Sequence, residues 1–213
     1  MKRSAVLFVE KATPATITEF HDVLSNDLES VKEKWSFEFK TFRSSVKNLP
    51  VGEPKLLHAV TFSHRDNQSV VIRSKSAIVT TAQGSTIPDD LVLNSCSAGA
   101  CEPFDSVLMS KLSNLWTLRQ SIKGDFGSTY KTTELTIRAA NIFSYGSFKG
   151  LVIELECEDD VAAEEFQQRV DKICNYLKDI SVGDFRTCSD HIDPSKPHFL
   201  CDVAYQYIRV LEL

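Results

Sequence analysis

The sequence lacks the positive charge that binding to nucleic acid or to an anionic membrane requires. Its 213 residues include 24 lysine and arginine side chains against 29 aspartate and glutamate side chains, so the formal net charge is −5. A protein that neutralises a phosphate backbone needs a surplus of basic side chains. We therefore expect neither direct nucleic-acid binding nor membrane binding.

Long apolar runs are also missing, and no run approaches the ~20 residues that span a bilayer. The opening residues carry a basic pair and an apolar run that ends at Glu10. That run is short for a secretory signal, and we expect a strand there. Gly/Ser linkers and internal repeats are absent, which predicts a single domain over residues 1–213. The sequence has six cysteines, at positions 96, 101, 157, 174, 188 and 201. Because no secretory signal is expected, we expect these cysteines to be reduced thiols, as in a cytosolic or nuclear protein.

The sequence does contain alternating strands and amphipathic helices. Apolar side chains at a period of two, or in short runs, predict strands at residues 4–10, 35–41, 56–64, 69–73, 76–81, 135–144 and 149–158. Apolar stripes at helical spacing predict four helices, which begin at Thr16, at Pro103, at Asp159 or Asp160, and after Pro197. Short strands in series, joined by tight turns such as Asp66-Asn67, indicate an antiparallel sheet. The predicted fold is α+β, an antiparallel β-barrel-like sheet with flanking helices.

Two of these helices carry more specific predictions. Thr16 and Glu19 have the spacing of a capping box, in which each side chain satisfies a backbone N–H at the start of a helix. The apolar stripe that begins at Phe104 continues through Leu115, so we expect that helix to extend to about Arg119 or slightly beyond. The stretch from 81 to 101 is rich in small and polar residues and predicts a loop.

Cys188, His191, His198 and Cys201 offer four zinc ligands in the order C-x₂-H…H-x₂-C. Thiolates and imidazoles suit tetrahedral zinc. The gap between the two halves is much shorter than the usual ~12–20 residues. We therefore favour Cys201 on the buried flank of the last helix and both histidines in a solvated loop. Cys188 with His191 also has the composition of a nucleophile–base pair, but no oxyanion hole is marked and an inert thiol is favoured.

Glu154, Glu156 and Glu158 lie on one face of a predicted strand, about 6.6–7 Å apart along it. Inside a barrel, and opposed by lysine and arginine, they would hold a divalent metal and a triphosphate, as paired carboxylates do in tunnel-type triphosphatases. A second Glu-x-Glu strand is missing. We therefore favour a half-buried strand with a solvent-facing ridge of carboxylates. Metal-dependent triphosphate hydrolysis is the alternative.

Two further motifs point to no function. Asp125-Phe126-Gly127 copies a metal-binding tripeptide of protein kinases, but the chain has neither a His-Arg-Asp loop nor a Gly-rich loop. Four aromatic residues between Trp35 and Phe42 lie near basic residues, a combination that binds single-stranded nucleic acid in some proteins. Glutamates in the same stretch and the acidic chain favour core packing instead.

Several blocks of sequence together carry a family resemblance. They run in order from end to end, at residues 4–10, 12–19, 46–50, 104–112, 110–116, 120–125, 148–155 and 201–213. In this combination the chain resembles subunit 20 of Mediator, the coactivator of RNA polymerase II, and is most similar to the budding-yeast members. The resemblance is weakest over residues 157–200, and the Cys/His set is not part of the family pattern.

The resemblance implies a β-barrel-like fold with peripheral helices, similar to RNA triphosphatase barrels, with a strand following the mid-chain helix. It implies a non-catalytic, nuclear subunit of the Mediator head module that takes part in preinitiation-complex assembly. The implied partners are the structurally related subunit 18, as a heterodimer, and subunit 8, with TATA-binding protein and RNA polymerase II nearby. No cofactor, metal or catalytic residue is implied. The surface that meets subunit 18 is left open.

Overall fold

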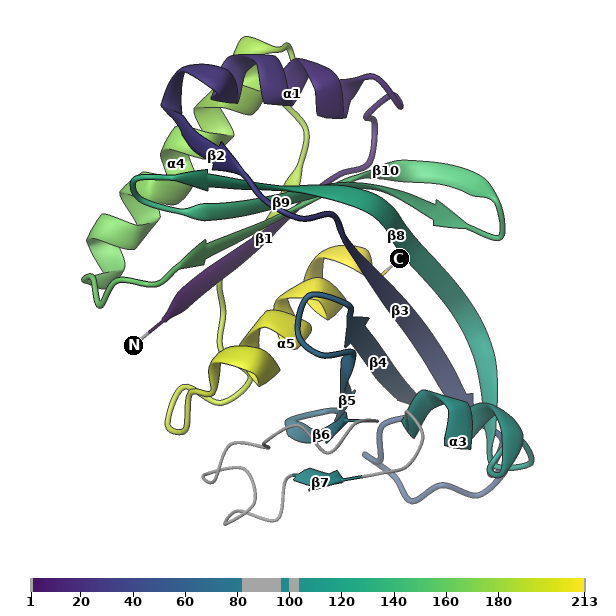
Figure 1. Cartoon of the computed structure of the whole chain (residues 1–213). Coiled ribbons are helices and arrows are strands. Elements are labelled where there is room, and N and C mark those ends of the chain that lie inside the picture. Colours follow the sequence, from purple (N-terminus) through teal and green to yellow (C-terminus); the bar gives the residue numbers. More distant parts are fainter. Residues whose placement is uncertain (1, 82–96, 100–103, 213) are drawn as a thin grey trace.

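One curled sheet organises the chain, and the computed structural model describes residues 2–81, 97–99 and 104–212. The strands are β1 (Arg3–Val9), β2 (Leu28–Val31), β3 (Trp35–Ser44), β4 (Leu56–Phe62), β5 (Gln68–Arg73), β6 (Ser76–Thr81), β7 (Ser97–Gly99), β8 (Trp116–Thr132), β9 (Thr136–Ser144), β10 (Ser147–Cys157) and β11 (Arg186–Cys188). Their order in the sheet is β11-β1-β10-β9-β8-β3-β4-β5-β6-β7, and β2 pairs with β8 (Figure 1). All pairs are antiparallel except β6 with β7.

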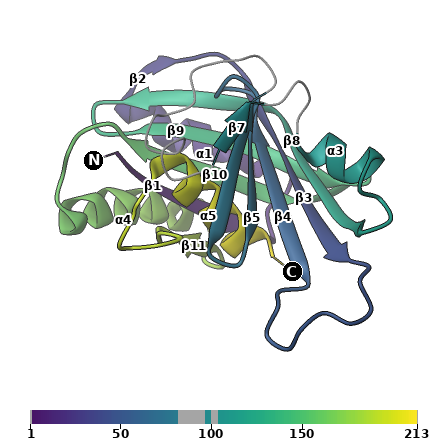
Figure 2. The same cartoon turned by 90° about the horizontal axis from the view of Figure 1, so that it is seen from below.

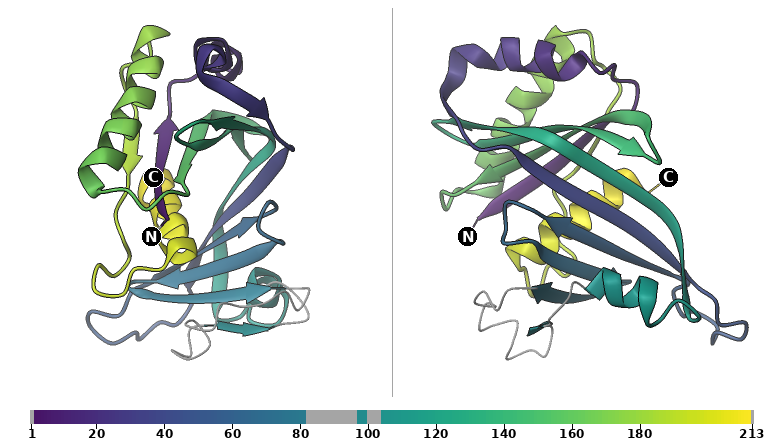
Figure 3. Two further views of the ribbon diagram at one scale, coloured as in Figure 1. Left: turned by 60° about the vertical axis from the view of Figure 1, so that its left-hand side comes forward. Right: turned by 45° about the vertical axis from the view of Figure 1, so that its right-hand side comes forward.

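Helices lie on both faces of the curled sheet. They are α1 (Thr16–Leu24), α3 (Phe104–Ser110), α4 (Ala163–Asp179) and α5 (Phe199–Leu211), and a short 3₁₀ turn covers Ser25–Asp27. Helices α1 and α4 lie outside the curl, whereas α5 lies inside it (Figure 3). Seen from below, α5 lies between β1 and β5 and contacts both strands (Figure 2). The predicted α+β class is confirmed. None of the helices in the described ranges is long and apolar enough to cross a membrane.

Strand β1 is buried on both faces, as its continuous apolar run predicts. Ala5 and Leu7 pack beneath α1 and α4, whereas Val6 and Phe8 face α5. The hydroxyl of Ser4 also donates to Oε1 of Gln206 on α5 at 2.9 Å. The first strand is thus held by the last helix.

The strand that begins at Trp35 packs into the core, which confirms the core packing predicted for its aromatic residues. Trp35 and Phe37 face α5, while Phe42 lies on the other side of the sheet under α3. Strand alternation alone places the even-numbered Phe42 on the face opposite to these odd-numbered residues. The turn after β4 is confirmed too, since Asp66 and its neighbour adopt φ of 52° and 53°.

The structure corrects three predictions about helices. The capping box does not form, because the Thr16 hydroxyl accepts the backbone N–H of Thr13 at 2.9 Å and the N-cap residue is Ala15. Helix α4 begins after Ala162, not at the aspartates before it. The mid-chain helix ends at Ser110, and residues 116–132 form β8.

The length of β8 explains that last error. Apolar side chains at spacings of three and four also occur by chance in a strand, and pairing with β3 and β9 then decides the structure. The strand following the mid-chain helix agrees with the family resemblance. Most of the loop predicted at 81–101, with Cys96 and Cys101, lies outside the described residues; within it, Ser97–Gly99 forms strand β7, so the prediction is wrong there.

Candidate functional site

Two carboxylates of β10 lie inside the curl in a network of charges. The side chains of Glu154 and Glu156 are 0% and 4% exposed. Nη1 of Arg138, which pairs with Glu154 across the β9–β10 ladder, donates to both carboxylates at 2.8 Å. Nη2 of Arg65, from the turn after β4, donates to the same two groups at 2.9 and 3.1 Å. We call these four residues the charge network.

The prediction of a solvent-facing ridge is therefore wrong. From Gly150 onward, strand β10 is buried on both faces, because its odd-numbered residues from Leu151 to Cys157 pack under α1 and α4 while Glu154 and Glu156 face α5. Buried charges are tolerated where close partners of opposite charge also satisfy their hydrogen bonds. Glu158 does not join them. It lies beyond the end of β10, is exposed, and is 3.6 Å from Nζ of Lys131.

Helix α5 closes the charge network from inside. The phenol of Tyr207 donates to Oε2 of Glu154 at 2.9 Å. Burial raises the pKa of Tyr207 well above its usual value, as does the neighbouring carboxylate, so the phenol stays protonated. Nε2 of His64 lies 3.6 Å from Oε1 of Glu154, and the His64 ring packs edge-on against Trp35. Burial lowers the pKa of His64, which therefore adds no charge at neutral pH.

The carboxylates remain ionised in this buried setting. Burial alone would raise the pKa of Glu154, but the positive charges of Arg65 and Arg138, together with the contact from His64, hold it below its usual range. The same two arginines outweigh burial at Glu156 and lower its pKa. The two buried arginines thus balance the two negative charges, and Nζ of the half-exposed Lys2 adds a further positive charge 3.4 Å from Oε1 of Glu156. The network fastens α5 to the sheet and leaves neither carboxylate exposed to solvent.

Sequence reasoning missed the partners of the two glutamates. Arg65 and Arg138 come from distant segments, and nothing in their local sequence marks them. One feature of the sequence did indicate that the glutamates are buried. Val152 precedes them on the same face of β10, and an apolar residue there indicates that this face also packs against other residues.

The four candidate zinc ligands do not form a metal site. Cys188 on β11 and Cys201 on α5 lie in the core that faces α5. Nδ1 of His191 lies 2.8 Å from Oδ2 of Asp202, and the same carboxylate accepts the backbone N–H of His198 at 3.0 Å. Within the described ranges, no three His, Cys, Asp or Glu side chains are placed to hold a metal ion.

These placements test the expectations for the Cys/His segment. The buried position of Cys201 is confirmed. The solvated loop is not, because both histidines are half-buried around Asp202. Burial raises the pKa of Cys188, which keeps the thiol protonated at neutral pH and agrees with an inert group.

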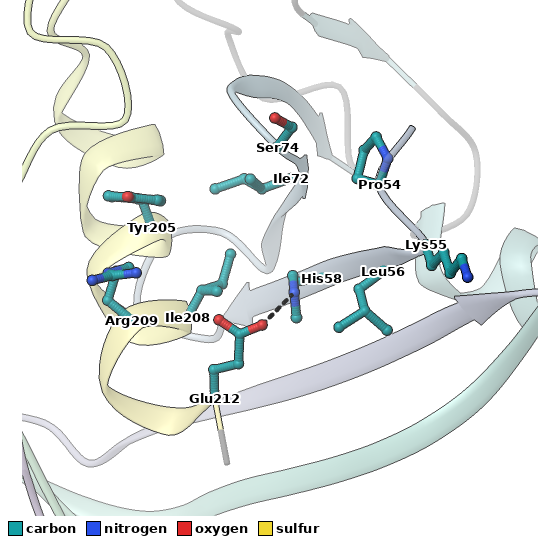
Figure 4. A pocket seen from close by; sticks show the side chains of 10 residues that line it. All are labelled: Pro54, Lys55, Leu56, His58, Ile72, Ser74, Tyr205, Ile208, Arg209 and Glu212. Carbon is teal, nitrogen blue, oxygen red and sulfur yellow. Dashed lines mark ion pairs between the residues drawn. The ribbon is translucent and has the colours of Figure 1, made fainter. Parts of the chain in front are cut away.

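A groove of about 330 Å³ opens between the end of α5 and strands β4 and β5 (Figure 4). Its apolar lining includes Leu56, Ile72 and Ile208. Nε2 of His58 lies 3.7 Å from Oε1 of Glu212 across the groove. Burial lowers the pKa of His58, so this contact is not an ion pair at neutral pH. The groove can receive an apolar side chain, and its geometry suggests no reaction.

A strip of aromatic side chains lies on the outer face of the sheet, at the β9–β10 hairpin and on β8. The aromatic strip consists of Phe126, Phe143, Tyr145 and Phe148. Phe126 is 86% exposed and Tyr145 is 76% exposed. Phe143 and Phe148 are half-buried and pack edge to face, with ring centroids 5.7 Å apart. Two shallow hollows of about 380 and 410 Å³ border the strip and share Asp125 and Phe143. Large exposed apolar groups gathered in one place are typical of protein-binding surfaces.

Comparison with known proteins gives the family. The model described as "TATA-binding related factor (TRF) of subunit 20 of Mediator complex" matches residues 1–212. The "Mediator of RNA polymerase II transcription subunit 20" of Eremothecium gossypii is 58% identical over 212 residues, with 100% of both chains covered. The protein of that name from Saccharomyces cerevisiae is 47% identical over 213 residues, again with 100% of both chains covered.

Solved structures are similar at a lower level. The PH1819 protein of Pyrococcus horikoshii has a TM-score of 0.45 at 14% identity, covering 87% of this chain and 93% of that one. A chain of the Schizosaccharomyces pombe Mediator head module has a TM-score of 0.39 at 12% identity, covering 87% and 98%. The assignment rests on the family model and the full-length relatives, which confirm the resemblance found in the sequence. The chain belongs to the Mediator subunit 20 family.

Proposed function

We propose that this protein is a non-catalytic, nuclear subunit of the Mediator head module that forms a heterodimer with subunit 18. Through subunit 8 it is held to the rest of the head module, where it supports assembly of the RNA polymerase II preinitiation complex near TATA-binding protein. The observation that carries the proposal is the family match over residues 1–212, which leaves no helix or strand of the described fold outside it.

The structure supports a binding role over a catalytic one. The interior carboxylates are ionised, neutralised by Arg65 and Arg138, and covered by Tyr207. A metal ion would have to replace the arginine contacts of both carboxylates, and a triphosphate would need the space that Tyr207 of α5 occupies. The outer face, in contrast, exposes Phe126 and Tyr145 to solvent. Covering such side chains with a partner releases water from apolar surface and favours association.

Co-expression with subunit 18 of the same organism tests the heterodimer. Size-exclusion chromatography with light scattering at micromolar concentration should give a single 1:1 species, and a specific interface of this kind buries at least about 1,000 Å² in total. A pull-down from nuclear extract should recover subunit 8 as well. Two separate monomers at that concentration would contradict the proposal.

The alternative, metal-dependent triphosphate hydrolysis, has one observation in its favour, because glutamates and arginines do face each other inside the curl. The purified protein is incubated with a nucleoside triphosphate and Mn²⁺ or Mg²⁺, and released phosphate is measured. We expect no turnover above the buffer rate. Turnover that disappears in the Glu156→Gln variant would establish the alternative.

A further inference from the structure

The helices cover the outer face of the sheet in two separate areas. At one end, α1 and α4 cover β1, β9 and β10 with residues such as Phe20 and Phe166. At the other end, Leu108 of α3 covers β4 and β5. The aromatic strip lies between these areas, on β8 and the β9–β10 hairpin, where Figure 1 draws no helix over the sheet. On the inner face of the described sheet, α5 packs against the strands and leaves the groove beside its end.

Both exposed aromatics are held in an unfavourable backbone conformation. Phe126 has φ of 55° and Tyr145 has φ of 48°. Residues with large side chains seldom adopt positive φ, and such conformations cluster at functional sites.

The bulge that carries Phe126 has a clear cause in the core. A Cβ at Gly124 would lie 2.3 Å from the ring of Phe37, and a Cβ at Gly127 would lie 2.5 Å from Nε1 of Trp35. The two glycines let these rings press against β8, and pairing with β9 is interrupted between Gly124 and Ser128. The residues between them are pushed outward, so the core itself presents Phe126.

The charges around the strip indicate the chemistry of the partner. Lys34 lines one of the two hollows and Lys149 follows Phe148, and within the described residues neither makes an ion pair. Lys123, in the second hollow, is 3.4 Å from Glu38. Asp125 lines both hollows and offsets one of these charges, so a small local excess of positive charge remains. In a chain of net charge −5, this excess favours a partner surface that carries carboxylates.

We infer that the aromatic strip is the surface that docks on subunit 18, and that subunit 18 meets it with apolar hollows edged by acidic side chains. The inference rests on the heterodimer proposed above. Phe143 and Phe148 of the strip lie on paired strands, Phe126 and Tyr145 are presented by the bulge and the turn beside them, and the hollows are shallow. Both properties suit a folded partner, since small-molecule sites are enclosed.

Asparagine substitutions separate binding from folding. Asparagine tolerates positive φ better than phenylalanine or tyrosine, and Asn-Gly is a preferred pair in the tight turn that Tyr145 and Gly146 now form. The double variant Phe126→Asn, Tyr145→Asn should therefore melt at or above the wild-type temperature. Its affinity for subunit 18, measured by titration calorimetry, should fall at least about 100-fold, because two aromatic anchors are lost.

A matched control removes apolar side chains elsewhere. Val51 and Ile78 are 107% and 42% exposed and lie outside the strip, so the variant Val51→Ser, Ile78→Ser should bind as wild type does. Reversing the rim charges with Lys34→Glu, Lys149→Glu should slow association about 10-fold at low salt and less at high salt.

The outcomes distinguish the two proposals. If the wild-type chain does not bind subunit 18, the heterodimer and the docking surface are both wrong. If the wild-type chain binds and the asparagine variant binds equally well, the heterodimer stands and the strip is not its interface. An equal loss of affinity in the Val51→Ser, Ile78→Ser control would also refute the proposal that the strip is the interface. Selective loss in a variant of unchanged melting temperature supports it.

Discussion

Replacing Tyr207 by phenylalanine removes one oxygen from the interior of the curl and isolates the contribution of one hydrogen bond. The ring contacts with Phe37 and Phe62, at 4.8 and 5.4 Å between centroids, are kept by a phenylalanine. Oε2 of Glu154 loses its contact with the phenol, while Oε1 keeps those with the arginines. The variant therefore tests how strongly the charge network holds α5.

The magnitude follows from the charge of the acceptor. A hydrogen bond to a charged group contributes roughly 1.5–3 kcal/mol to folding. In a domain of this size, 1 kcal/mol corresponds to about 2–4 °C in melting temperature. Tyr207→Phe should therefore lower the free energy of unfolding in a urea titration by roughly 1.5–3 kcal/mol, and the melting temperature by about 3–12 °C.

Tyr205→Phe on the same helix is the control. Tyr205 is half-buried, and no hydrogen bond of its hydroxyl is found within the described chain, so its removal should change the free energy of unfolding by less than about 0.5 kcal/mol. Equal effects of the two variants, or a loss below 0.5 kcal/mol for Tyr207→Phe, would refute the role given to the network.

Three other predictions concern stability. Burial lowers the pKa of His64 from 6.5, and the arginines lower that of Glu154 from 4.5 against the opposing effect of burial. In both cases the unfolded chain binds more protons than the folded chain as the pH falls, so acidification should destabilise the fold. The urea midpoint should begin to decline below about pH 6.5, where His64 of the unfolded chain is protonated, and fall more steeply below about pH 4.5, where Glu154 of the unfolded chain is protonated. A midpoint that rises on acidification would contradict this. Asp105 on α3 accepts from the buried Lys40 at 2.6 Å, and Lys40 also donates to Glu38 at 2.9 Å; because the lysine keeps this second carboxylate, Asp105→Asn should cost about 1.5–3 kcal/mol in urea unfolding, the contribution of one charged hydrogen bond, with recovery in Asp105→Leu, Lys40→Met. EDTA should leave the melting temperature unchanged, whereas a drop restored by zinc would reveal a structural metal.

The spacing of apolar residues predicted which faces of β1 and α5 are buried. The continuous apolar run of β1 predicted a strand covered on both faces, and the stripe of α5 that includes Tyr207 predicted its buried side. The segment after Ser110 was mispredicted, since its apolar spacing fits a helix and a strand equally well. Pairing with β9 and with β3, which lies about 80 residues away in sequence, decides that it is a strand.

The interior of the curl depended on information that the local sequence does not carry. The alternation around Glu154 is that of a half-exposed strand, and its burial follows from Arg65, Arg138 and α5, which are 89, 16 and about 50 residues away. The exposed position of Phe126 was equally hidden, because an aromatic residue in an apolar strand is more often buried. Its exposure follows from glycines beneath two core rings.

The pairing of Arg3–Val9 with residues 151–157, and the bond from Ser4 to Gln206, have a consequence for how the molecule is made. On the ribosome, the first strand emerges long before the segments that flank it exist, and its apolar side chains must wait uncovered through most of synthesis. Such long-range closure slows folding and exposes the nascent chain to aggregation. We therefore expect ribosome-bound chains that have not yet released Phe199–Leu211 to depend on chaperones, and completed chains to become independent of them.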